Sequence, residues 1–202
     1  DADISVTICQ VMALRAARNA GLPPEGRNFK PHVTLAWLTH PRIEALARVI
    51  AEATQKKDWA KFASLMHPAA LAEFKGMFAP IVKLEGAAEM RKMLFGVETA
   101  AQFDALSDEA AFEKLMANLT ANVPGLSEAL ATSEMILVGS LPEGDDLVHV
   151  VYHSGAKTQG VVFSKTAVMT FRRYQGEWRA LLAGSFEGLT QRFAQMAGAA
   201  GD

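Results

Sequence analysis

The chain has 202 residues, of which 50% are hydrophobic and 21% are charged, so it is long enough and apolar enough to bury a core. Its formal net charge of -2 excludes a global field that would attract nucleic acid or an anionic membrane, so such binding would need a local patch. The single cysteine, Cys9, excludes an intramolecular disulfide and a zinc site built from cysteines.

The beginning of the sequence bears on where the protein acts. No uncharged apolar run approaches the roughly 20 residues that a membrane helix needs, so we expect no membrane partner. The first residue is Asp1, and no charged-then-apolar signal segment follows it. We expect either that a signal peptide was removed, which would make the protein exported, or that an upstream lobe is missing, which would make it cytoplasmic.

Residues 1–41 predict a short β-α-β segment. Residues 4–11 have the alternation of a strand, residues 12–20 have the composition of a helix, and residues 29–38 predict a second strand. In that second strand His32 and Thr34 are two residues apart, so they project from the same face. An imidazole titrates near neutrality and a neighbouring hydroxyl can hydrogen-bond a phosphate oxygen, so this spacing suits phosphate chemistry.

Residues 10–42 resemble the second of the two His-x-Thr/Ser segments of the two-histidine (2H) phosphoesterases, which are RNA 2',3'-cyclic phosphodiesterases. The match includes Gly21-Leu22 and the run from Arg27 through Pro31-His32-Val33-Thr34-Leu35. The resemblance implies that His32 is one of two acid-base histidines and that Thr34 holds the phosphate of an RNA end. None of the other four histidines reads His-x-Thr/Ser, so the first segment is absent from this sequence.

Residues 42–66 change to a helical pattern. Apolar residues at helical spacing predict an amphipathic helix over 42–57. Asp58 predicts the cap of a second helix, and Pro68 predicts the first residue of a third. His67 lies at the junction of these two helices, where we expect it to cap or to hydrogen-bond the corner rather than to act in catalysis.

The middle of the chain is interrupted by glycines. We expect a short strand near residues 81–84 and a helix near residues 87–94. Ser107 then predicts the cap of a helix whose first turn carries Asp108 and Glu109, and Pro124-Gly125 ends it. The acidic pair is interpreted as a helix start and not as a metal site.

The last third of the chain predicts a four-stranded antiparallel meander. Its strands are rich in Val, Phe, Thr and Tyr and cover residues 135–138, 147–153, 161–173 and 177–182. Turn-forming residues separate the strands at Pro142-Glu143-Gly144-Asp145, Ser154-Gly155 and Gln175-Gly176. A tail helix over residues 186–196 follows, and we expect residues 197–202 to fray.

Four residues of the meander are candidates for lining a pocket: His149, Tyr152, His153 and Trp178. His149 and His153 share a face of their strand, but four residues at about 3.3 Å each place them roughly 13 Å apart, too far to ligate one metal ion together. We therefore predict no metal site and no cofactor.

Residues 42–196 resemble the nuclear transport factor two-like superfamily, including its SnoaL-like members. Helices precede a long antiparallel meander whose penultimate hairpin reads Thr-Phe-Arg-Arg-Tyr-Gln-Gly-Glu-Trp-Arg, residues 170–179. The resemblance implies an α+β fold in which the sheet curves around the helices as a cone with an apolar pocket. That fold hosts enzymes, ligand binders and dimerisation modules, so function has to come from the pocket.

Three functions follow from these patterns. The first is a non-catalytic or small-molecule-binding cone domain, residues 42–196, that takes a small apolar ligand and carries a remnant phosphoesterase segment. The second is an RNA 2',3'-cyclic phosphodiesterase that uses His32 and Thr34 with a missing second lobe. The third is a module that forms a homodimer through the open sheet.

Overall fold

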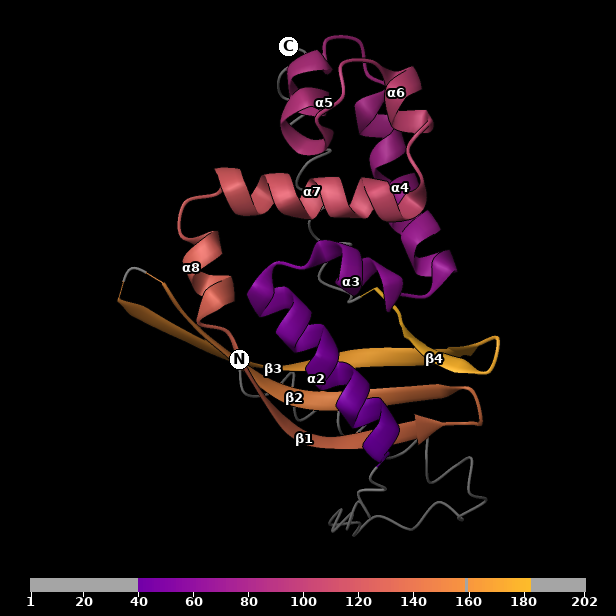
Figure 1. Cartoon of the computed structure of the whole chain (residues 1–202), viewed down its shortest axis with the longest axis vertical. Helices are drawn as coiled ribbons and strands as arrows, with labels where there is room; N and C mark the ends of the chain where they lie inside the picture. The colour runs from indigo at the N-terminus through magenta and orange to yellow at the C-terminus, as the bar shows by residue number, and fades with distance from the viewer. Residues whose placement is uncertain (1–39, 159, 183–202) are drawn as a thin grey trace, which may run out of the picture.

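The computed structural model describes residues 40–158 and 160–182, and in them helices precede an open four-stranded antiparallel sheet (Figure 1). The predicted α+β class and the predicted meander are confirmed. The predicted β-α-β segment and the tail helix lie outside the described residues, as do His32 and Thr34.

Three helices lie next to the sheet: α2 (Pro41–Lys56), α3 (Trp59–Ser64) and α8 (Leu126–Ala131). Figure 1 shows α2 crossing the sheet on the side where the described helices lie. Helix α2 buries Ile43, Ala47, Ile50 and Ala53, which are three or four positions apart and form one stripe. This stripe packs on buried residues of the sheet, so the amphipathic pattern of the sequence sets how α2 lies on the strands.

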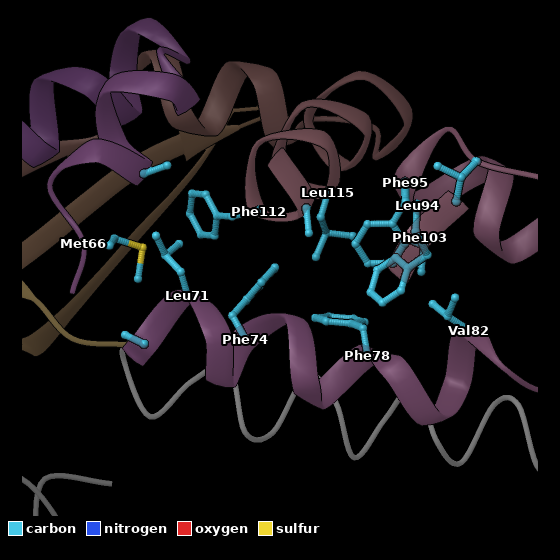
Figure 2. Close-up of a cluster of buried hydrophobic side chains, with 14 residues drawn as sticks. Met66, Leu71, Phe74, Phe78, Val82, Leu94, Phe95, Phe103, Phe112 and Leu115 are labelled. Atoms are coloured by element: carbon cyan, nitrogen blue, oxygen red, sulfur yellow. The ribbon is translucent and has the colours of Figure 1, made fainter. Parts of the chain in front are cut away.

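The remaining helices form a second layer farther from the sheet: α4 (Pro68–Val82), α5 (Ala88–Phe95), α6 (Ala100–Asp104) and α7 (Asp108–Asn122). Their core is a group of fully buried aromatic side chains, Phe74, Phe78, Phe95, Phe103 and Phe112. Figure 2 shows the rings of α4 pointing toward those of the other three helices. Ring centroids 4.7–5.5 Å apart with tilted planes give the edge-to-face contacts that aromatic pairs favour.

The predicted helix starts are confirmed by their capping hydrogen bonds. The Asp58 carboxylate accepts from the Lys61 amide (3.0 Å), and the Ser107 hydroxyl accepts from the Ala110 amide (3.1 Å). His67 caps α4 through Nδ1, which accepts from the Ala69 amide (3.1 Å), so it has the corner role expected of it. These side chains satisfy amides that the first turn of a helix leaves without partners.

Three local predictions were wrong. Pro142 and Glu143, expected to lie in a turn, are the last two residues of the first strand and pair with Val148 and Leu147. The strand expected near residues 81–84 does not form, because Ile81 and Val82 belong to the last turn of α4 and are buried. Ser154-Gly155, expected to be a turn, lies inside a strand. The short helices α6 and α8 had no counterpart among the predicted elements.

The strands are β1 (Glu134–Glu143), β2 (Leu147–Thr158), β3 (Val161–Tyr174) and β4 (Glu177–Ala180), paired in sequence order. The β2–β3 turn includes Gly160, whose φ of +79° suits glycine because it has no Cβ. Strand β1 carries a bulge: Leu137 pairs with Tyr152 and Gly139 pairs with Val151, which leaves Val138 as the extra residue.

Candidate ligand-binding cavity

A cavity of about 320 Å³ lies between the sheet and the helices that cover it. Helices α2, α3 and α8 form one side and the helix-facing surface of the strands forms the other. Most of its wall is apolar. The lining residues are Ile50, Ala51, Thr54, Phe62, Met66, Ala129, Leu130, Ser133, Glu134, Met135, Tyr152, Ser154, Ala156, Val168, Met169, Ala180, Leu181 and Leu182.

The alternation of β2 brings Tyr152 to this cavity. Val148 and Val150 are buried against α2, and side chains two residues apart in a strand share a face. Tyr152, Ser154 and Ala156 continue that face beyond the edge of the packed core, where they line the cavity. Tyr152 is the one predicted pocket residue that lines it.

The hydroxyl groups in the cavity wall differ in whether another described residue engages them. Within the described residues, no hydrogen bond engages the side chain of Tyr152 or of Ser154, whereas Thr54 bonds the Ile50 carbonyl (2.9 Å) and Ser133 bonds the Leu130 carbonyl (2.7 Å). Burial raises the pKa of the Tyr152 hydroxyl, because the phenolate is poorly solvated there. The group therefore stays protonated and can donate a hydrogen bond as well as accept one.

His149 and His153 lie on the opposite face of the sheet. Nε2 of His149 is 2.9 Å from a Glu143 carboxylate oxygen, and Nδ1 is 3.0 Å from the Thr170 hydroxyl. Nδ1 of His153 is 3.1 Å from the Thr166 hydroxyl. Because β2 is regularly paired with β3, the odd-numbered side chains point away from the helices. The structure therefore separates both histidines from Tyr152.

Trp178 lies at a third location, near the start of α2. Its ring packs against the core cluster that α2 forms with the sheet, and the Arg173 guanidinium lies 5.1 Å from the ring centroid. It lines a separate groove of about 540 Å³. Of the four predicted pocket residues, Tyr152 and Trp178 therefore line two different hollows, and His149 and His153 line neither of them.

The sequence did not point to the apolar side chains that form most of the cavity wall, among them Met66, Met135 and Met169. Their pattern is that of ordinary core residues, since a hollow depends on how distant elements pack and not on local spacing. One signal could have grouped some of the lining residues: Met135 and Tyr152 lie on the same face of two paired strands, as the alternation of each strand indicates.

The described part of the chain holds no group of three or more His, Cys, Asp or Glu side chains placed to share a metal ion. Among residues 40–158 and 160–182, no helix combines the length and the apolar composition that crossing a membrane requires. Comparisons of the chain with protein-family models, with curated proteins and with solved structures found no match.

Proposed function

We propose that the protein binds a small, largely apolar molecule carrying one hydrogen-bonding group in the cavity between α2, α8 and the sheet. The observation that supports this most is the combination of an apolar wall with the hydroxyls of Tyr152 and Ser154, which no described residue engages in a hydrogen bond. Ligand sites combine these features, because apolar burial supplies affinity and a few polar groups orient the ligand.

The volume limits the size of the ligand. A cavity of about 320 Å³ is roughly twice the ~150 Å³ engineered cavity that holds one benzene molecule. It also lies at the lower end of the ~300–1,000 Å³ range of small-molecule sites. A bicyclic or short branched molecule fits this space, whereas a long acyl chain would extend beyond it.

The wall favours an adaptable site over a rigid one. Three of its side chains, Met66, Met135 and Met169, are methionines, which are unbranched and polarisable. Such side chains adjust to ligands of different outline and contact aromatic rings favourably. We therefore expect related apolar molecules to bind with similar affinities.

The test uses 2-naphthol as the probe, followed by calorimetry and by the fluorescence of the probe. We expect saturable binding at one site per chain. Ala156→Leu places three more carbon atoms in the cavity and should weaken binding about tenfold or more, since binding and filling compete for the same volume. Ala72→Leu adds the same atoms on the exposed side of α4 and should leave binding unchanged.

Two results would contradict the proposal. One is the absence of saturable 2-naphthol binding by the folded wild-type chain. The other is equal binding by wild type and Ala156→Leu, which would place the probe elsewhere. Circular dichroism of each variant shows whether the fold is retained.

The exposed face of the sheet supports a second candidate function, the formation of a homodimer. Ile136 and Val162 pair with His153 and Lys157 of β2, so both share the face turned away from the helices, and they are 62% and 74% exposed. Light scattering should then report a dimer that Ile136→Glu converts to a monomer. Val49→Glu, at an exposed apolar position on α2, is the control that should stay dimeric.

The phosphodiesterase alternative depends on the sequence pattern of residues 10–42, of which residues 10–39, including His32 and Thr34, lie outside the described residues. Incubation with a 2',3'-cyclic nucleotide tests it directly. Turnover that disappears in His32→Ala would support it, and no turnover by the wild-type chain would reject it.

A further inference from the structure

A second groove, of about 540 Å³, opens beside the first turn of α2. Its walls come from that turn, from the β1–β2 turn and from the end of the β3–β4 hairpin. The apolar part of the lining includes Ile43, Val148 and Trp178, and the charged part consists of Arg42, Arg173 and Asp145. It is a different hollow from the cavity of the proposed function, because the two share no lining residue among those described.

The two arginines of the groove have no acidic partner in the described part of the chain. Within the described residues, neither guanidinium forms an ion pair, although lysine and arginine side chains pair with acids elsewhere there. Arg173 lies against Trp178 instead, with its guanidinium carbon 5.1 Å from the ring centroid. A guanidinium that rests on an aromatic face keeps the N–H groups along its edge available for an oxyanion.

The start of α2 adds to the positive potential of the groove. The amides of Ile43 and Glu44 are satisfied by the His40 carbonyl (2.9 and 3.0 Å), and Pro41 has no amide hydrogen. A helix of 16 residues nevertheless carries a partial positive charge at its first turn, which Arg42 reinforces. His40 also lines the groove, and its buried Nε2 has no hydrogen-bond partner among the described residues.

Asp145 limits the charge that the groove accepts. Two guanidiniums and one carboxylate leave a single net positive charge among the lining residues, counting His40 as neutral. This balance suits one oxyanion group, while the apolar floor and the indole ring suit a flat hydrocarbon body. A polyanion such as RNA would place further negative charge beside the Asp145 carboxylate.

We propose that this groove binds a small amphiphilic anion. Its oxyanion head, a phosphate monoester or a carboxylate, is held by Arg42 and Arg173, and its planar apolar body lies on Trp178. The site goes beyond the proposed function, since it takes a charged ligand at a separate place in the fold.

The experiment titrates the full chain with phenyl phosphate and with benzoate and follows binding by calorimetry at low salt. Inorganic phosphate serves as the head group alone. We expect saturable binding of at least one aromatic anion, weakened about tenfold by Arg42→Gln and by Arg173→Gln, because each loses a charge-assisted hydrogen bond. Arg48→Gln, on the same helix but outside the groove, should bind as the wild type does. The ratio between the two probes tells a phosphate site from a carboxylate site.

Trp178→Leu separates the two halves of the proposed contact. This substitution should weaken the binding of phenyl phosphate and leave the binding of inorganic phosphate unchanged. If this variant or Arg173→Gln fails to fold by circular dichroism, Arg42→Gln at the exposed start of α2 still decides the question.

Two outcomes would overturn the proposal: no saturable binding of either aromatic anion, or binding that both arginine substitutions leave unchanged. Ala156→Leu distinguishes binding in this groove from binding in the apolar cavity. It should weaken 2-naphthol binding about tenfold or more and preserve the binding of the anion.

Discussion

The amide of His67 donates a hydrogen bond to the carbonyl oxygen of Ala180 (2.8 Å), and the amide of Ala180 donates in turn to the Leu65 carbonyl (2.9 Å). The corner between α3 and α4 therefore pairs with the last residue of β4, with Met66 and Ala180 in parallel register. Arg179 strengthens the junction through a bond to the Ser64 carbonyl. The helices and the sheet are thus joined by backbone hydrogen bonds as well as by packing.

His67 should make this junction sensitive to acid. Burial, and then the nearby Arg172 charge, lower the pKa of His67 below its ordinary value of 6.5. The unfolded chain therefore binds a proton at a higher pH than the folded chain does, so the stabilisation is complete above pH 6.5 and is lost as the pH falls toward the folded pKa. Protonated Nδ1 can no longer accept the Ala69 hydrogen bond.

The comparison of wild type with His67→Asn isolates this effect. Asparagine keeps a capping oxygen but does not titrate. We expect urea unfolding to show a larger loss of stability between about pH 7.5 and pH 5 for the wild type than for the variant. Parallel losses in the two proteins would show that other groups cause the acid sensitivity.

Phe95 anchors the aromatic cluster of the second helical layer. It is fully buried and lies between the rings of Phe78 (5.5 Å) and Phe103 (4.7 Å). Phe95→Ala should lower the free energy of unfolding by about 3–5 kcal/mol, through lost burial and the cavity left behind. Met93→Ala, two residues earlier and 57% exposed, should change it by less than about 0.5 kcal/mol. Chemical denaturation measures both.

Two glycine substitutions should have opposite signs. Gly96 ends α5 with φ +63°, a conformation that a Cβ disfavours, so Gly96→Ala should destabilise the fold by about 1 kcal/mol. Gly76 lies inside α4, and a Cβ added there meets nothing within 4 Å. Gly76→Ala should therefore stabilise it by about 0.5–1 kcal/mol. Thermal unfolding of the pair checks the prediction, and shifts of the same sign would contradict it.

Tyr152 should show its burial in an alkaline titration. Its pKa is raised above 10.0 because burial disfavours the phenolate. Folding favours the protonated form, so this contribution to stability is complete below pH 10 and is lost as the pH rises through and above that value. Tyrosine absorbance measures the titration, and Tyr152→Phe should remove its late component. The same variant should weaken 2-naphthol binding more than naphthalene binding, because it removes a hydrogen bond and keeps the apolar surface.

The sequence predicted the elements whose ends are determined by their own side chains. Asp58, Pro68 and Ser107 each mark a helix start, and each acts within one turn of its own position. The strand expected near residues 81–84 failed for the opposite reason. Pro80 interrupts the helical pattern locally, yet Val82 packs into the aromatic cluster and the helix continues through it. Tertiary packing decides such a case.

The candidate site was predictable in part. Alternation along β2 places Tyr152 and His149 on opposite faces, and the spacing alone contains that information. The positions of α2 and α8, which are distant from β2 in the sequence, determine which face the helices cover. They also determine the volume of the cavity. Local patterns thus predicted which residues share a face of the sheet, but they did not predict the cavity between one face and the helices.

The bulge in β1 also has a consequence for the length of the chain. Met135 and Leu137 face the helices before it, and Ser140 faces them after it, so the parity changes from odd to even. The change occurs at Val138, the bulge residue, which has no pairing partner on β2. A version of the protein one residue shorter at this point would keep every side chain of β1 on its present side, whereas a deletion in the regularly paired β2 would turn half of that strand over.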